Sequence, residues 1–178
     1  EVNSYWDRGV LGIALDPQFT TSRPYLYIYY VYDAPPGQVA PVWNDTCPDP
    51  PSGLKDGCVV TSKVARYTVG PGNAASPASR VELLHDWCQQ YPSHTGGGIA
   101  FGQYGELYIS GGEGGSFNVT DYGQLGGTLP TPQNPVTPVN PCNDPVTLLA
   151  PKPDGAPNVD IVSAQGGSLR SQDARTTA

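Results

Sequence analysis

Residues Tyr25–Tyr32 have the sequence YLYIYYVY, in which every residue is aromatic, β-branched or leucine. Residues of these types favour β-strands, so the stretch predicts a strand. Because the run is apolar at odd and even positions alike, we expect both faces of the strand to be covered by other layers. A second apolar run, Val10–Leu15 (VLGIAL), lies between Gly9 and Asp16-Pro17 and is predicted to be a short buried strand.

The next segments extend this β pattern. Residues 63–69 (KVARYTV) alternate and are expected to pair with the preceding strand, and residues 81–84 form a further short apolar stretch. Residues 97–101 (GGIAF) and 106–110 (ELYIS) flank a glycine-bounded turn, which predicts a β-hairpin. The predicted fold class is therefore all-β. No exact repeat is visible, but strand units recur at the roughly 40–50-residue spacing that is typical of propeller blades.

Composition narrows the possible classes of protein. The chain has 178 residues, of which 22 are Gly and 20 are Pro, and both residue types are poorly tolerated inside helices. Only 14% of the residues are charged and 10% are aromatic, which argues against a disordered chain. The formal net charge is −7 and no Lys/Arg cluster is present, so we expect no nucleic-acid binding. No apolar run approaches the length of a membrane span, so none is predicted.

Prolines and cysteines mark the predicted loops. Residues 33–58 and 130–157 are proline-rich and are predicted to be insertions within a single, incomplete domain over residues 1–178. The four cysteines contain no C-x-x-C pair and only two histidines accompany them, which argues against a metal site of the zinc type. We expect disulfides between Cys47 and Cys58 and between Cys88 and Cys142, although four cysteines allow three connectivities. Disulfides indicate a secreted or periplasmic protein.

Three stretches together resemble a known family. They are residues 7–19 (DRGVLGIALDPQF), 94–102 (HTGGGIAFG) and 107–115 (LYISGGEGG). This set is similar to the glucose/sorbosone dehydrogenases, soluble quinoproteins with a six-bladed β-propeller. The resemblance implies that the chain forms about two to three blades of such a propeller. It also implies that the chain is a fragment of a secreted sugar dehydrogenase, which would use a sugar substrate and an external electron acceptor.

The resemblance also assigns roles to individual residues. Family members bind pyrroloquinoline quinone (PQQ) and calcium, and His94 matches the histidine that removes a proton from the sugar hydroxyl. An imidazole suits this role because its pKa lies near neutrality. Glu113 matches the family carboxylate, there an aspartate, that would orient the histidine. Asp7 stands where one branch of the family has a substrate-contacting glutamine. The residues that hold the cofactor are expected beyond residue 178, so the fragment alone should be inactive.

A second interpretation belongs to another class of protein. Some propellers keep the scaffold and lose the site, so the chain is alternatively a catalytically inactive extracellular propeller that binds carbohydrate or a protein partner. The changes at Asp7 and Glu113 favour this alternative, whereas the presence of His94 favours the enzyme. A structural interpretation of Asp7 and Arg8 is a surface ion pair, which contributes little to stability.

Overall fold

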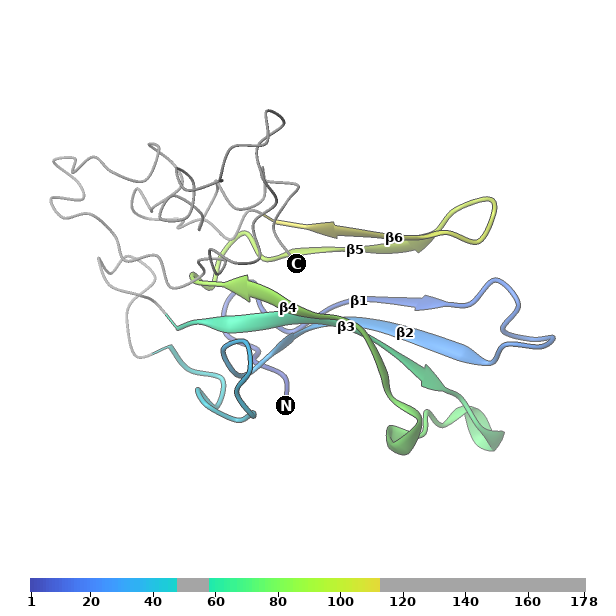
Figure 1. The fold of residues 1–178 in the computed structure, drawn as a ribbon, viewed down its shortest axis with the longest axis horizontal. Helices are drawn as coiled ribbons and strands as arrows, with labels where there is room; N and C mark the ends of the chain where they lie inside the picture. Colours follow the sequence, from blue (N-terminus) through green and yellow to red (C-terminus); the bar gives the residue numbers. More distant parts are fainter. Residues whose placement is uncertain (48–57, 113–178) are drawn as a thin grey trace, which may run out of the picture.

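A computed structural model describes residues 1–47 and 58–112, and this part of the chain is built of antiparallel β-strands (Figure 1). Two single-turn 3₁₀ helices, Pro71–Asn73 and Pro77–Ser79, connect two of the strands. No helix in these residues is long and apolar enough to cross a membrane. The strands are β1 (Val10–Leu15), β2 (Tyr25–Tyr32), β3 (Val60–Thr68), β4 (Val81–Gln89), β5 (Gly96–Phe101) and β6 (Leu107–Gly111).

Strands β1 to β4 form one four-stranded sheet in chain order. The register between β2 and β3 is unbroken from the pair Tyr25–Thr68 to the pair Tyr32–Thr61. The bounds of β1 and β2 agree with the prediction, whereas β3 and β4 are longer than predicted. The all-β class and the antiparallel pairing are thus confirmed for the described residues, in which the sheets do not close on themselves.

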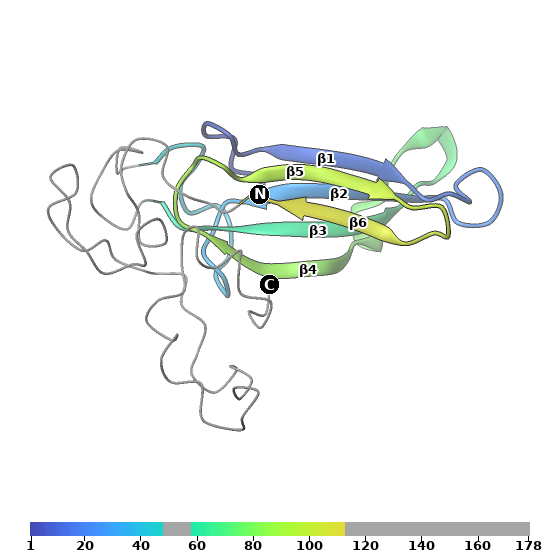
Figure 2. The ribbon, with the colours of Figure 1, turned by 90° about the horizontal axis from the view of Figure 1, so that it is seen from above.

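The β5–β6 hairpin lies on one face of this sheet as a second layer (Figures 1 and 2). The ring of Phe101 meets the ring of Tyr27 edge-on, with 5.0 Å between the ring centroids. Glycine makes this close approach of the layers possible, because a Cβ atom on Gly12 would lie 2.6 Å from Cγ2 of Ile99. The aromatic strand predicted from the sequence therefore packs against the predicted hairpin.

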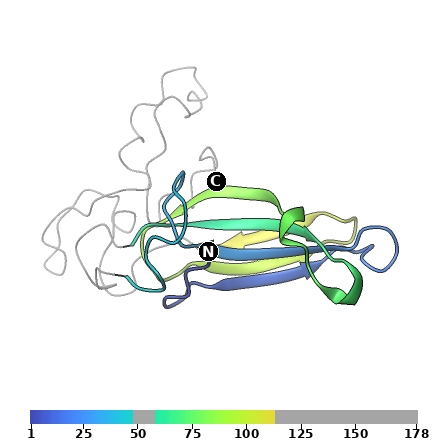
Figure 3. The same ribbon diagram turned by 90° about the horizontal axis from the view of Figure 1, so that it is seen from below.

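The other face of the sheet is covered unevenly. The last four residues of β2 are buried, and Tyr30 and Tyr32 pack with Ala34 and Ala65 on this side. The prediction that β1 is a buried strand is wrong, because Ile13 and Leu15 are 60% and 51% exposed. Gly12 faces the hairpin, and side chains alternate along a strand, so Ile13 and Leu15 lie on the opposite face of the sheet from the hairpin. Figure 3 shows no other strand of the described chain over this side of β1.

Burial of the tyrosines predicts how stability depends on pH. Burial is the main cause that raises the pKa of Tyr30, and the neighbouring Arg80 partly opposes it. A phenol whose pKa is higher in the folded state adds stability that is complete below its unfolded pKa, about 10, and is lost as the pH rises further. We expect the stability advantage of the wild type over Tyr30→Phe, measured by urea unfolding, to shrink between pH 9 and pH 11. A stability advantage that stays constant over this range would contradict a raised pKa of Tyr30 in the folded protein.

Candidate functional site

The structure brings together two of the predicted site residues, Asp7 and His94. Asp7 lies in the loop before β1, and His94 lies in the loop between β4 and β5. The backbone N–H of Asp7 donates to the carbonyl of Pro92 (3.1 Å), and the backbone N–H of His94 donates to Oδ2 of Asp7 (3.0 Å). Asp7 therefore fixes the loop that carries His94, although 87 positions separate the two residues.

An open pocket of about 240 Å³ lies at this junction, lined by Trp6, Asp7, Ser93 and His94. The indole of Trp6 is half exposed and Ser93 is buried, so the pocket has an aromatic wall and a polar floor. Trp6 and His94 each have a φ of 55°. A positive φ is unusual for a residue as bulky as Trp, and the other non-glycine residues with positive φ in the described chain are Asn or Asp. Strained backbone of this kind collects at functional sites.

Glu113, the predicted orienting carboxylate, lies outside the described residues. The chain that leads to it is described as far as Gly112, whose N–H donates to the carbonyl of Thr95 (3.3 Å). Gly112 also lies directly against the backbone carbonyl of His94, where a Cβ atom would collide with that oxygen. Glu113 therefore follows in sequence a residue that touches His94.

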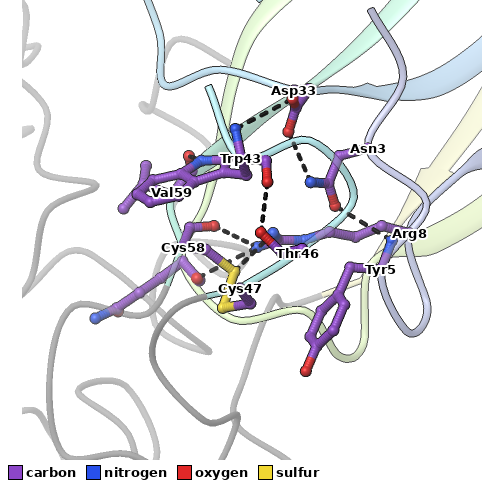
Figure 4. The surroundings of a disulfide bond; sticks show 10 residues. Asn3, Tyr5, Arg8, Asp33, Trp43, Thr46, Cys47, Cys58 and Val59 are labelled. Atoms are coloured by element: carbon purple, nitrogen blue, oxygen red, sulfur yellow. Dashed lines mark hydrogen bonds between the residues drawn. A yellow bond between two sulfur atoms is a disulfide. The ribbon is translucent and has the colours of Figure 1, made fainter. Parts of the chain in front are cut away.

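Arg8 corrects the interpretation of Asp7 and Arg8 as a surface ion pair. Arg8 is 5% exposed, and its side chain points toward the disulfide (Figure 4). The guanidinium donates to Sγ of Cys58 (3.0 Å), to the carbonyl of Cys58 (2.7 Å) and to the carbonyl of Gln90 (3.3 Å). Burial lowers the pKa of Arg8 to about 9, and Asp33 partly opposes this shift. Arg8 thus joins the loop before β1, the disulfide and the end of β4.

The disulfide predicted between Cys47 and Cys58 is present, with 5.3 Å between the Cα atoms. It closes the first predicted insertion, of which residues 33–47 are described and irregular. Cys88 is buried and disulfide-bonded. Cys142, its predicted partner, lies outside the described residues, as does the second predicted insertion.

Asp33 organises the first insertion, and the sequence analysis did not single it out. Its carboxylate is buried and accepts hydrogen bonds from the side chain of Asn3 (2.7 Å) and from three backbone N–H groups, those of residues 42–44 (2.9–3.1 Å). Figure 4 shows Asn3 and Trp43 on either side of this carboxylate. In the sequence, Asp33 is marked only by its position directly after the aromatic strand. Many aspartates follow strands, so this position alone does not identify Asp33 as a structural residue.

The described residues of the pocket do not fit PQQ or calcium. The quinone carries carboxylate groups that require cationic partners, but no Lys or Arg lines the pocket, and the nearby Arg8 points toward the disulfide. Within residues 1–47 and 58–112, no group of three or more His, Cys, Asp or Glu side chains could hold a metal ion. We therefore derive no step through either group from these residues.

The chain was compared with known families and proteins. No protein-family model and no curated protein matches it. A functional assignment therefore depends on the geometry of the pocket and on the motifs in the sequence.

Proposed function

We propose that the pocket between the loop before β1 and the loop before β5 binds a sugar, and that the chain is the substrate-side part of a sugar dehydrogenase with a β-propeller fold. The observation that carries the proposal is the pair of strained residues, Trp6 and His94, which face one pocket from two distant segments. The resemblance to the glucose/sorbosone dehydrogenases assigns to one of them, His94, the role of a base.

The arrangement of the strands supports the propeller. A blade is a four-stranded antiparallel sheet whose strands follow in chain order, and the next blade stacks on its face. Strands β1 to β4 have this order, and the β5–β6 hairpin begins a second layer on the face of the first (Figure 2). In this proposal β5 and β6 are the first two strands of the next blade.

The pocket has the side chains that recognition of a sugar requires. The half-exposed indole of Trp6 offers a flat apolar surface on which the C–H face of a sugar ring can stack. Asp7 and His94 provide polar groups for the hydroxyls at the edge of such a ring. Pockets of this kind combine an aromatic wall with a few polar groups that fix the orientation of the ligand.

His94 would act on the hydroxyl that is oxidised. Asp7 holds its backbone N–H, and Gly112 packs against its carbonyl, so both peptide groups of the residue are fixed. A positioned imidazole can accept the proton of a bound hydroxyl on one ring nitrogen. The oxidation itself would be the chemistry of the quinone. The residues that bind PQQ and calcium would lie outside the described ones.

Titration of the chain with an aldose tests the sugar site. We expect the indole N–H signal of Trp6 in an NMR spectrum to shift, because the ring stacks on the sugar. The indole of Trp43 donates to the carbonyl of Val59 (2.7 Å) and serves as an internal reference that stays in place. Trp6→Ala should weaken binding about 3- to 10-fold, which is the usual range for loss of an aromatic contact.

Two further variants complete this test. Trp6→Phe keeps an aromatic face and should retain most of the affinity. Tyr104→Ala, at an 85% exposed residue in the β5–β6 turn, should leave the affinity unchanged. No shift of the Trp6 signal at millimolar aldose would refute the sugar site. Binding of aldose with no turnover in any cofactor-loaded protein that contains this chain would favour the catalytically inactive carbohydrate-binding propeller.

A further inference from the structure

Asp7 gives the pocket a negative charge that no basic residue of its described lining balances. Asp7 is exposed, and its Oδ2 atom accepts the backbone N–H of His94 (3.0 Å). Within residues 1–47 and 58–112, no donor reaches Oδ1 of the same carboxylate. The lining that the structure describes contains no Lys or Arg. The second carboxylate oxygen is therefore available to a donor on a ligand.

The basic residues of the described chain are all engaged elsewhere. The guanidinium of Arg8, the neighbour of Asp7, donates to the carbonyls of Cys58 and Gln90. Carboxylates or a tyrosine ring hold the remaining ones, which are Arg23, Lys63, Arg66 and Arg80. None of these ion pairs includes Asp7, so its charge has no Lys or Arg partner among the residues that the structure describes.

The aromatic wall of the pocket attracts the kind of group that this carboxylate would bind. Trp6 is 50% exposed and lines the pocket together with Asp7. The face of an indole is electron-rich and attracts cations more strongly than the ring of Phe or Tyr does. An indole also packs against the apolar face of a sugar ring. The two residues together are complementary to a ligand that combines an apolar face with a positive charge at its edge.

We propose that the pocket selects an amino sugar, that is, an aldose with a protonated amine, over a neutral or an acidic sugar. The C–H face of the ring would stack on Trp6, and the ammonium at the edge of the ring would pair with the carboxylate of Asp7. The inference rests on the proposed sugar site and adds the class of sugar that this site prefers. It concerns binding alone and adds no chemical step.

The charge of the whole chain acts in the same direction. The formal net charge is −7, and a negative field raises the local concentration of cationic ligands. An acidic sugar would bring a second carboxylate next to Asp7, which like-charge repulsion disfavours. Because the pocket is open, water and salt screen these charges, so the preference for the cation is expected to be about 3- to 10-fold.

NMR titration with three sugars that differ in charge tests the proposal. The probes are glucosamine, glucose and glucuronate, and the measured quantity is the Kd from the indole N–H signal of Trp6. At pH 7 an amine of this kind is mostly protonated. At low salt, glucosamine should bind about 3- to 10-fold more tightly than glucose, and glucuronate should bind more weakly than glucose. Added salt should bring the three Kd values together, because it screens the charge of Asp7.

Asp7→Asn is the informative variant, because it removes the charge and keeps an oxygen that can accept the N–H of His94. Glucosamine and glucose should bind to this variant within about twofold of one another. Asp45→Asn is the matched control. Asp45 is also exposed, its Oδ1 accepts a backbone N–H, that of Ser4 (2.7 Å), and it does not line the pocket. This control should keep the wild-type order of the three sugars.

The outcomes separate the selectivity from the sugar site itself. Equal Kd values for glucosamine and glucose in the wild type, or a preference that persists in Asp7→Asn, would overturn the amino-sugar assignment and leave the sugar site intact. No shift of the Trp6 signal with any of the three sugars would refute the site. Ethanolamine has the ammonium without the ring and should bind at least about tenfold more weakly than glucosamine. Equal affinity for ethanolamine would show a general ammonium site and would also overturn the assignment.

Discussion

Replacement of His94 by Asn is expected to lower turnover by about 10²- to 10⁴-fold in a cofactor-loaded protein that contains this chain, which is the usual contribution of a positioned general base. The physical reason is the loss of the imidazole that would take the proton of the sugar hydroxyl. Asn is the informative replacement because it tolerates the positive φ of 55° at this position, whereas Ala adds a backbone penalty. Reduction of a dye with an aldose as the electron donor measures the effect.

A variant of the other histidine of the chain, His85, is the control for this assay. His85 is exposed on β4, and His85→Asn should retain wild-type turnover. NMR titration should show that His94→Asn still binds the aldose within a few-fold of the wild type, since Trp6 and Asp7 remain. Full activity of His94→Asn would contradict the role of His94 as a base and leave the pocket as a binding site.

Replacement of Arg8 by Met is expected to lower the free energy of unfolding by about 3 kcal/mol. The variant keeps much of the volume of the side chain but leaves the buried carbonyls of Cys58 and Gln90 without their donor, at about 1–3 kcal/mol for each. The variant also removes a buried charge, whose desolvation is unfavourable in the wild type. The net loss of stability is therefore smaller than the sum of the costs for the two carbonyls. Urea unfolding at pH 7, with the disulfide intact, measures the change.

The matched control is an arginine at the surface. The side chain of Arg23 is half exposed, and its Nε lies 3.4 Å from Oδ1 of Asp16. Arg23→Met should therefore change the free energy of unfolding by less than about 1 kcal/mol. The Arg8 variant should also shift the backbone N–H signal of His94, because Arg8 fixes the end of β4 just before that loop. An Arg8→Met protein as stable as the wild type would show that these hydrogen bonds add no net stability.

Arg8 and Asp7 connect the fold with the pocket. The two residues are neighbours in sequence but contact different parts of the structure. Asp7 binds the loop of His94, and Arg8 binds the disulfide and the end of β4. The Cys47–Cys58 disulfide and the carboxylate of Asp33 fix the far side of the same loop cluster. Trp6 and His94 therefore hold their strained conformations on a support that is anchored at several points, as such conformations require.

Local pattern was sufficient to predict the bounds of β1 and β2 and the presence of the β5–β6 hairpin, but not the full lengths of β3 and β4. The run of aromatic and β-branched residues placed β2 at its observed bounds, and the glycine-bounded turn predicted the β5–β6 hairpin. The positions of Cys47 and Cys58 at either side of one loop favoured the disulfide that joins them. These features depend on residues that are near one another in the chain, and their preferences survive in the folded protein because the tertiary contacts agree with them.

The tertiary structure alone decided which side chains are buried and which residues meet. An alternating or apolar strand specifies two faces, but which face is covered depends on segments far away in the chain. Ile13 and Leu15 are therefore exposed although their run predicts burial, and Arg8 is buried although its charge predicts exposure. The contact between Asp7 and His94 likewise joins residues 87 positions apart, a distance over which no local preference acts.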